Sequence, residues 1–322
     1  MGVKNENAIY DRHGNSVRIW IGNDDEEVEL DKEKFELILV DLYKIGIRKN
    51  IPYLIIKYPF IIKDIINFNL LSRAGRKEIV EIVRRKIIKY VLKLGGYPHN
   101  LKVEIGRSTL SFNETPVLFS DLFWLIKDII LYDQYNMQKS SIKNKIVVDA
   151  GANVGIFSIY AAVLGAKKIY AFEPVKETYD ILVENIKRNE LENRIIPINK
   201  GLGNKNEIKI ISYKCGGDGE ANISAKKNKE LKNQSAELIL LDDFVKENNI
   251  ERIDFIKMDT EGYEENILLG AKETIKRWKP ILSFSAYHKP TDKERLPKIV
   301  KSIRPDYRIT LNKFSEEDFY CE

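Results

Sequence analysis

The pattern of apolar residues changes near residue 145. Upstream, the segments 31–47, 53–71 and 73–93 repeat apolar residues at helical spacing, which predicts helices with one buried face. One strand, "VRIWI", is expected near the start of the chain, and a hairpin, "LKVEIGRSTLSF", is expected after residue 100. We therefore expect a mainly helical accessory region over residues 1–96 and a second domain over residues 97–322.

Downstream of residue 145, short apolar runs alternate with amphipathic segments. "KIVVDAG", "KKIYAFEP" and "IDFIKMD" have the composition of buried strands, and segments such as "KETYDILVENIKRNE" and "EENILLGAKETIKRW" separate them as helices. A strand-rich excursion is expected over 207–241. The alternation predicts an α/β fold with a mainly parallel sheet. The last two strands, "YRITLN" and "DFYCE", are joined by a short turn and must be antiparallel.

Composition sets limits on this picture. The 43% hydrophobic and 31% charged content favours a soluble protein with a sizeable core. No apolar run reaches the roughly 18 residues that span a bilayer, so no integral membrane segment is expected. Cys215 and Cys321 lie far apart, so a cysteine zinc site is not indicated and a cytoplasmic location is the default. Abundant Ile, Lys and Glu favour a thermophile, although an AT-rich genome gives the same bias.

Charge leaves one open question. The formal net charge is +5, and the segment 73–93 is strongly basic between its apolar positions. The simplest interpretation is a solvated helix face, and the alternatives are a docking face for phosphate, lipid headgroups or RNA. Because the chain lacks a recognisable RNA-binding module, nucleic acid is not the expected partner.

The stretch "VVDAGANVG" predicts a ligand-binding loop. A buried strand is followed by a glycine-rich turn and then by the start of a helix, whose free N–H groups favour anions. In open α/β sheets, ligands bind outside the carboxyl ends of the strands, where this loop is expected. The alternative is a structural glycine turn that binds no ligand.

The acids around this loop indicate which ligand is expected. Asp149 would repel a pyrophosphate but attract an ammonium and a sulfonium, and S-adenosylmethionine carries both. Glu173, in "FEP" after the next strand, can accept hydrogen bonds from ribose hydroxyls, although Glu173 alone would fit NAD equally well. The pair favours S-adenosylmethionine as cofactor. The expected cofactor-binding residues are those of the two motifs: Asp149, Ala150, Gly151, Asn153, Gly155, Glu173 and Pro174.

The stretch "MDTEGYEE" and a later histidine predict the catalytic side. Asp259 and Glu261 should lie at the carboxyl end of their strand, and His288 should end the next one as a base or as a structural residue. Glu264 and Glu265 are expected to start a helix. Asp259 and Glu261 could hold a hard cation. With no third ligand that the sequence places, no metal is expected.

The chain resembles the FkbM-type methyltransferases. The resemblance rests on "VVDAGANVGIFSIYAA", "AFEP", "LDDF", "DFIKMDTEGYEENILLGA" and "KPILSFSAYHKPTD", in this order over residues 145–292. It implies a class I methyltransferase sheet, Rossmann-like and seven-stranded, with an antiparallel last strand. It also implies methyl transfer to oxygen, most often to a hydroxyl of a sugar, glycan or polyketide.

Several partners and functions follow from these features. The leading expectation is an O-methyltransferase that acts on a sugar or glycan hydroxyl, with a lipid-linked glycan as one form of the acceptor. The alternatives are an RNA or carboxyl methyltransferase and a non-catalytic protein that binds S-adenosylmethionine. A homodimer is the assembly to test.

Overall fold

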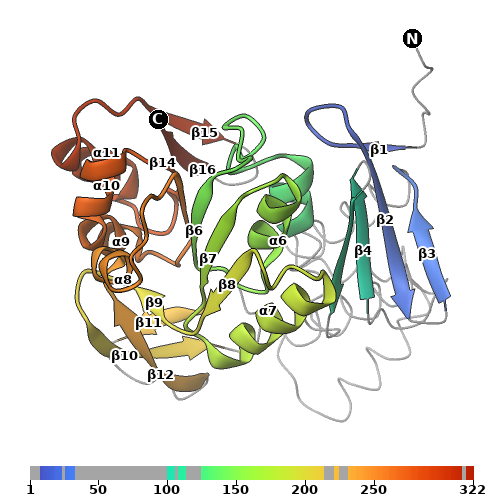
Figure 1. Ribbon diagram of the computed structural model, residues 1–322, viewed down its shortest axis with the longest axis horizontal. Coiled ribbons are helices and arrows are strands. Elements are labelled where there is room, and N and C mark those ends of the chain that lie inside the picture. The colour runs from blue at the N-terminus through green and yellow to red at the C-terminus, as the bar shows by residue number, and fades with distance from the viewer. Residues whose placement is uncertain are drawn as a thin grey trace, which may run out of the picture. The chain divides into compact units, whose positions relative to one another are not determined.

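The computed structural model describes residues 8–23, 26–32, 100–105, 108–113, 125–213, 221–224, 231–313 and 317–322 (Figure 1). The chain divides into two compact units, residues 1–123 and residues 124–322. Apart from residues 31 and 32, the helices expected over 31–47, 53–71 and 73–93 lie outside the described residues, as does Cys215. No helix in the described part of the chain is long and apolar enough to cross a bilayer.

The first unit contains an antiparallel sheet. Its strands are β1 (Ile9–Tyr10), β2 (Ser16–Asn23), β3 (Glu26–Leu30), β4 (Asn100–Ile105) and β5 (Ser108–Asn113). They pair in the order β1-β2-β4-β5, with β3 also on β2. Val17 and Ile19, two positions apart on β2, are both buried, as alternation along a strand requires. The expected strand and hairpin are confirmed. Because the hairpin pairs with β2, it belongs to this unit, and the division falls after residue 123 and not after 96.

The second unit is built on a seven-stranded sheet. Its strands are β6 (Ile146–Ala150), β7 (Lys168–Phe172), β8 (Ile195–Ile198), β13 (Phe255–Met258), β14 (Ile281–Ser285), β15 (Ile309–Lys313) and β16 (Glu317–Cys321). They lie in the order β15-β16-β14-β13-β6-β7-β8. The pairs from β8 to β14 are parallel, and β16 runs antiparallel to both of its neighbours. The expected class I methyltransferase sheet, with its antiparallel last strand, is confirmed.

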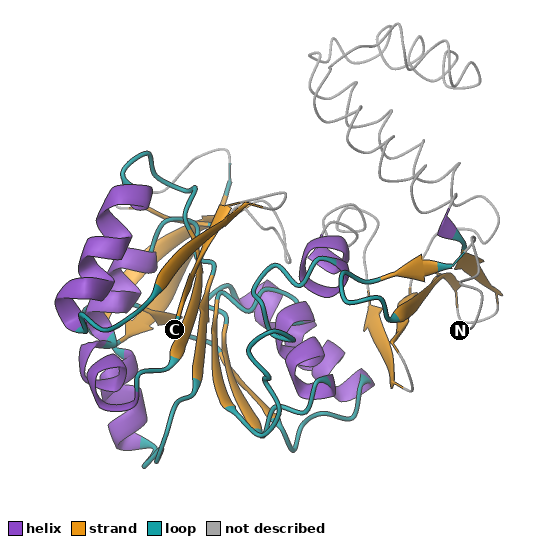
Figure 2. Ribbon diagram, turned by 90° about the horizontal axis from the view of Figure 1, so that it is seen from above, coloured by secondary structure: helices purple, strands orange, loops and turns teal. Residues whose placement is uncertain are grey.

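Helices cover both faces of this sheet (Figure 2). They are the π-helix η2 (Ile126–Leu131), α6 (Ile156–Val163), α7 (Lys176–Arg188), α8 (Leu241–Glu247), α9 (Glu264–Gly270), α10 (Lys272–Trp278) and α11 (Asp292–Ile303). The segment "EENILLGAKETIKRW" forms two helices instead of the single one expected. After the break, the Asp242 carboxylate stabilises the start of α10 by accepting hydrogen bonds from the N–H groups of Glu273 and Thr274.

The expected strand-rich excursion is confirmed, and its strands form a small sheet of their own. Its strands are β9 (Gly201–Leu202), β10 (Glu207–Tyr213), β11 (Asn222–Ser224) and β12 (Lys232–Ile239), in the order β11-β10-β12-β9. Only the β12–β9 pair among these is parallel. Gln234 of β12 donates to the carbonyl of Pro174, which ties this sheet to the segment after β7.

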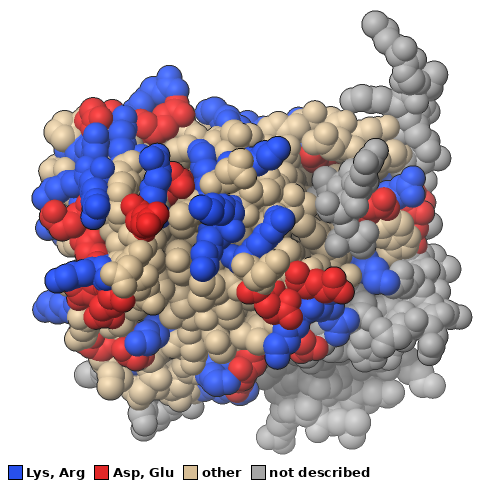
Figure 3. Space-filling view, in the orientation of Figure 1, with Lys and Arg blue, Asp and Glu red and all other residues tan. Residues whose placement is uncertain are grey.

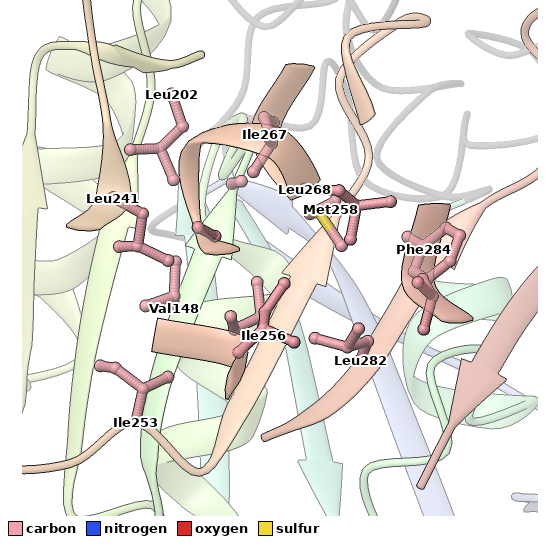
Figure 4. Packing of buried hydrophobic residues seen from close by; sticks show 14 of the residues in the cluster. Val148, Leu202, Leu241, Ile253, Ile256, Met258, Ile267, Leu268, Leu282 and Phe284 are labelled. Atoms are coloured by element: carbon pink, nitrogen blue, oxygen red, sulfur yellow. The ribbon is translucent and has the colours of Figure 1, made fainter. Parts of the chain in front are cut away.

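The main core lies between the central strands and helices α8 to α11 (Figure 4). Ile256 and Met258 of β13 point into this core and are 1% exposed. Each such side chain contributes roughly 1.5–3 kcal/mol when fully buried. Because side chains alternate along a strand, Lys257 points to the opposite face, where it lies near the rings of Tyr135 and Phe157. A charged residue in the centre of this sheet needs a partner, and that partner belongs to the candidate site.

Candidate active site

The loop between β6 and α6 requires glycine at two positions. Gly151 has φ +75°, and a Cβ atom there would lie 2.0 Å from the carbonyl oxygen of Asp259. Gly155 has φ +95°, and a Cβ atom there would lie 2.6 Å from Leu182 Cδ1. Asn153 also adopts a positive φ, of 49°. The loop thus turns sharply at the carboxyl end of β6 while its backbone packs against the end of β13.

The Asp149 side chain holds this loop in place. It is fully buried, and Oδ2 accepts a hydrogen bond of 2.6 Å from Ser158 Oγ. Oδ1 lies 3.1 Å from Lys257 Nζ, which also donates to the carbonyl of Gly151 at 2.7 Å. Neither Lys257 nor Ser158 was assigned from the sequence. Lys257 lies directly opposite Asp149 because β13 pairs with β6 in this register, which only the structure shows.

Glu173 follows β7 and is held by two backbone groups. Oε2 accepts from the N–H of Asn153 at 3.0 Å, and Oε1 accepts from the N–H of Val175 at 2.9 Å. Burial raises the pKa of Glu173 to about 7, against the opposing effect of these two hydrogen bonds and of Lys257. A carboxylate has about four acceptor positions, so each oxygen can accept one more hydrogen bond.

These residues fit S-adenosylmethionine. Glu173 can accept hydrogen bonds from the two ribose hydroxyls, and the glycine turn lets a ligand approach the backbone. Asp149 is fully buried and fixes the position of the loop through Ser158 and Lys257. Ala150 contributes its backbone, because its carbonyl accepts the Asp259 N–H at 3.1 Å.

Asp259 lies directly after β13, and two hydroxyl groups hold it. Tyr135 OH donates to Oδ2 at 2.8 Å, and Ser285 Oγ, from β14, donates to Oδ1 at 2.9 Å. Burial, and then the charge of Asp259, raises the pKa of Tyr135 well above its usual value, so the phenol stays a donor. Tyr135, in the stretch "LYDQYN", was not assigned from the sequence.

The structure brings the three predicted catalytic residues together. His288 Nε2 lies 3.6 Å from Asp259 Oδ1 and 3.7 Å from Glu261 Oε2. Glu261 and Gly262 have φ values of 53° and 90°, and this tight turn follows directly on Asp259. Glu264 does more than start α9. It is 1% exposed, accepts from the N–H and Oγ1 of Thr260, and lies 3.2 Å from His288 Nδ1.

Glu265 behaves as expected of a helix start. It lies in the first turn of α9 and pairs with Arg295 of α11 at 2.7 Å. Glu264 and Glu265 are therefore adjacent in sequence and different in environment, since only Glu264 faces the histidine.

The carboxylates decide the charge of His288. Burial acts to lower its pKa, but Glu264, Asp259 and Glu261 together raise the pKa to about 9. As the site stands, the imidazole is protonated at pH 7. A protonated ring cannot accept a proton, so the expected role of His288 as a base does not follow from this arrangement alone.

Comparisons with known proteins place the chain among methyltransferases. A curated relative, the methyltransferase sdnD of Sordaria araneosa, is 28% identical over an alignment of 159 residues that covers 40% of this chain and 61% of the relative. The hexuronic acid methyltransferase AglP of Haloferax volcanii is 24% identical over 180 residues, covering 55% of this chain and 70% of that protein. Enzymes that modify tRNA are also among the curated relatives. The chain thus spans about three fifths of the length of the first of these relatives.

A solved structure of the same kind also matches. The FkbM methyltransferase of Methylobacillus flagellatus KT is 26% identical, with a TM-score of 0.44, covering 56% of this chain and 44% of that one. The protein-family model "Methyltransferase FkbM domain" matches residues 149–318, which are more than half of the chain. The matched segment contains Asp149, Glu173, Asp259 and His288. The chain therefore belongs to the FkbM family of S-adenosylmethionine-dependent methyltransferases.

Proposed function

We propose that the chain transfers a methyl group from S-adenosylmethionine to a hydroxyl oxygen of a sugar or glycan. The observation that carries the proposal is the contact between the cofactor loop, which follows β6, and the acid cluster, which begins at the end of β13. Gly151 of the cofactor loop packs so closely on the carbonyl of Asp259 that no side chain would fit between them. The expected cofactor residues and the acid cluster therefore adjoin at the carboxyl ends of neighbouring strands, β6 and β13.

When bound, S-adenosylmethionine supplies an activated methyl group. The acceptor forms an O–CH₃ bond as the S–CH₃ bond breaks, S-adenosylhomocysteine leaves, and the hydroxyl proton passes to the carboxylate of Asp259 or Glu261. Asp259, Glu261 and His288 form the acceptor side in this proposal. Asp259, fixed by Tyr135 and Ser285, can orient the hydroxyl by accepting its proton in a hydrogen bond.

Two observations support a sugar acceptor. The relative AglP is a hexuronic acid methyltransferase. Tyr287 is 37% exposed, and its ring centroid lies 4.3 Å from that of His288. Aromatic rings with an exposed face are common in ligand sites, where they pack against the apolar face of a sugar. A lipid-linked acceptor, a homodimer, a cytoplasmic location and a thermophilic source stay predictions of the sequence.

The test combines cofactor binding with methyl transfer. Calorimetry should detect one S-adenosylmethionine per chain, and the methyl-tritiated cofactor should label glycans that contain hexuronic acid. Asp259→Asn should abolish labelling while cofactor binding persists, because Asp259 lies on the acceptor side. Cofactor binding without transfer to any sugar would favour a non-catalytic protein or another acceptor, and no cofactor binding would overturn the proposal.

Transfer to RNA or to a carboxyl group is the competing activity. The tRNA-modifying relatives favour RNA, and the mixed charge of the face drawn in Figure 3 does not. Basic side chains lie beside acidic ones over much of the face in Figure 3, whereas RNA-binding faces concentrate Lys and Arg. Binding of tRNA that weakens steeply with salt, together with labelling of tRNA, would replace the sugar by RNA.

A further inference from the structure

Three side chains converge where β13 and β14 end. Asp259, Glu264 and His288 each offer one ligand atom, and these atoms all lie within 4.8 Å of one another. They come from three places: the end of β13, the first turn of α9, and the segment that follows β14. Glu261 adds a further carboxylate 3.7 Å from His288 Nε2.

The imidazole of His288 points to a missing ligand. Its side chain is 6% exposed, and the carboxylate oxygens nearest its ring nitrogens, at 3.2 Å and 3.6 Å, are not aligned for a regular hydrogen bond with either nitrogen. Leaving a buried polar group without a hydrogen bond costs about 1–3 kcal/mol. A cation bound to one nitrogen would remove that cost.

The charge of the cluster also calls for a cation. Within the described residues, no Lys or Arg forms an ion pair with Asp259 or Glu264. Even with His288 protonated, one positive charge faces the carboxylates of Asp259 and Glu264. Buried carboxylates are normally paired or bound to metals.

Outer hydrogen bonds hold the carboxylates in place. Asp259 accepts from Tyr135 and Ser285, and Glu264 accepts twice from Thr260, at 2.8 Å and 3.0 Å. Metal ligands are commonly oriented by such partners, whereas acids that only start a helix do not need them.

We propose that Asp259, Glu264 and His288 bind a divalent cation of the kind that accepts both imidazole and carboxylate ligands, such as Mn²⁺. The inference rests on the proposed function for its role, which is to bind the hydroxyl oxygen of the acceptor as a Lewis acid. His288 is then a metal ligand and does not act as the base. Of the two acids that the sequence offered, Asp259 is a ligand in this set. Glu264 and His288 are the two ligands that the fold brings to it.

Mn²⁺ binding to the full chain tests the site directly. The protein is treated with EDTA, desalted and titrated with MnCl₂, and free Mn²⁺ is followed by electron paramagnetic resonance. One Mn²⁺ per chain is expected. Glu264→Gln and His288→Asn should each weaken binding about tenfold or more. Glu265→Gln is the matched control, because the Glu265 carboxylate is next in sequence but pairs with Arg295 instead of facing His288. The Mn²⁺ affinity of this variant should equal that of the wild type.

The outcomes separate this inference from the proposed function. No stoichiometric Mn²⁺ binding, or equal binding by wild type and His288→Asn, overturns the cation site, whatever the methylation assay shows. His288→Asn keeps a polar side chain at this position, and a circular-dichroism spectrum that matches the wild type qualifies it to decide the question even if Glu264→Gln does not fold. Mn²⁺ binding without any methyl transfer would sustain the site and reject the proposed function.

Discussion

At the scale of single residues, Glu173 links cofactor binding to pH. Its pKa is raised from 4.5 to about 7, so the neutral carboxyl predominates in the free protein below neutrality. Ribose hydroxyls bind better to the carboxylate. We expect the affinity for S-adenosylmethionine to rise with pH, so that binding at pH 6 is about tenfold weaker than at pH 8. Calorimetry across this range measures the change, and Glu173→Gln should bind weakly with no pH dependence.

The same residue affects stability with a defined sign. Because the folded-state pKa lies above the unfolded one, the unfolded chain binds fewer protons between pH 4.5 and about 7. The free energy of unfolding should therefore fall by about 3 kcal/mol as pH rises through this window, as far as Glu173 alone is concerned. Urea denaturation of Glu173→Gln, compared with wild type at several pH values, isolates this contribution. Parallel curves for the two proteins would contradict it.

The buried pair of Asp149 and Lys257 is a second prediction at this scale. Lys257→Met leaves the Asp149 charge fully buried without its cation, and breaking a buried pair costs about 3–5 kcal/mol. Urea denaturation should show this loss. The double variant Asp149→Asn with Lys257→Met should recover much of it, because no unpaired charge remains. Equal destabilisation of the single and double variants would show that the pairing is unimportant.

Tyr287 tests the sugar interpretation. It lies beside His288 and exposes part of its ring. In the proposed function, Tyr287→Ala should raise the KM for a sugar acceptor about tenfold, which corresponds to about 1.4 kcal/mol of binding free energy. The affinity for the cofactor should not change. A KM that stays constant in the methyl-transfer assay would remove Tyr287 from the acceptor side.

At the scale of elements, two loops depend on each other. The β6–α6 loop and the end of β13 approach so closely that Gly151→Ala would place a methyl group 2.0 Å from a backbone oxygen, at a φ of +75°. We expect this variant to lose cofactor binding and at least about 2 kcal/mol of stability, measured by calorimetry and urea denaturation. Gly203→Ala is the control, since its nearest new contact is 3.4 Å. Similar losses in both variants would argue against the close contact as the cause.

The sequence predicted most elements because period and composition are local signals. The strands "KIVVDAG" and "IDFIKMD" and the helix "KETYDILVENIKRNE" were all recognisable in this way. The break between α9 and α10 was not, because it depends on Asp242 from a helix more than 25 residues away. Likewise, Lys257 and Tyr135 reach the site through register and packing, which spacing in the sequence does not encode.

At the scale of the whole molecule, the chain consists of two compact units, and the second carries every residue assigned to the site. The sequence suggested a division after residue 96, where the predicted helices end, because the hairpin of β4 and β5 resembles any other pair of strands. Only its pairing with β2 shows which unit it joins. Boundaries of this kind depend on contacts between distant segments and are therefore difficult to derive from local pattern.

We predict that residues 124–322 fold alone and bind S-adenosylmethionine with the affinity of the full chain. This segment contains the seven-stranded sheet and its core.

A fragment of residues 146–322 is the matched comparison. It lacks η2 and Tyr135, whose ring packs edge-on against Phe157 at 5.5 Å and whose hydroxyl holds Asp259. It should unfold at lower urea concentration and expose the face that carries Lys257. Equal stability of the two fragments would show that the segment before β6 is not part of the folded unit, and loss of cofactor binding in both would assign a role to the first unit.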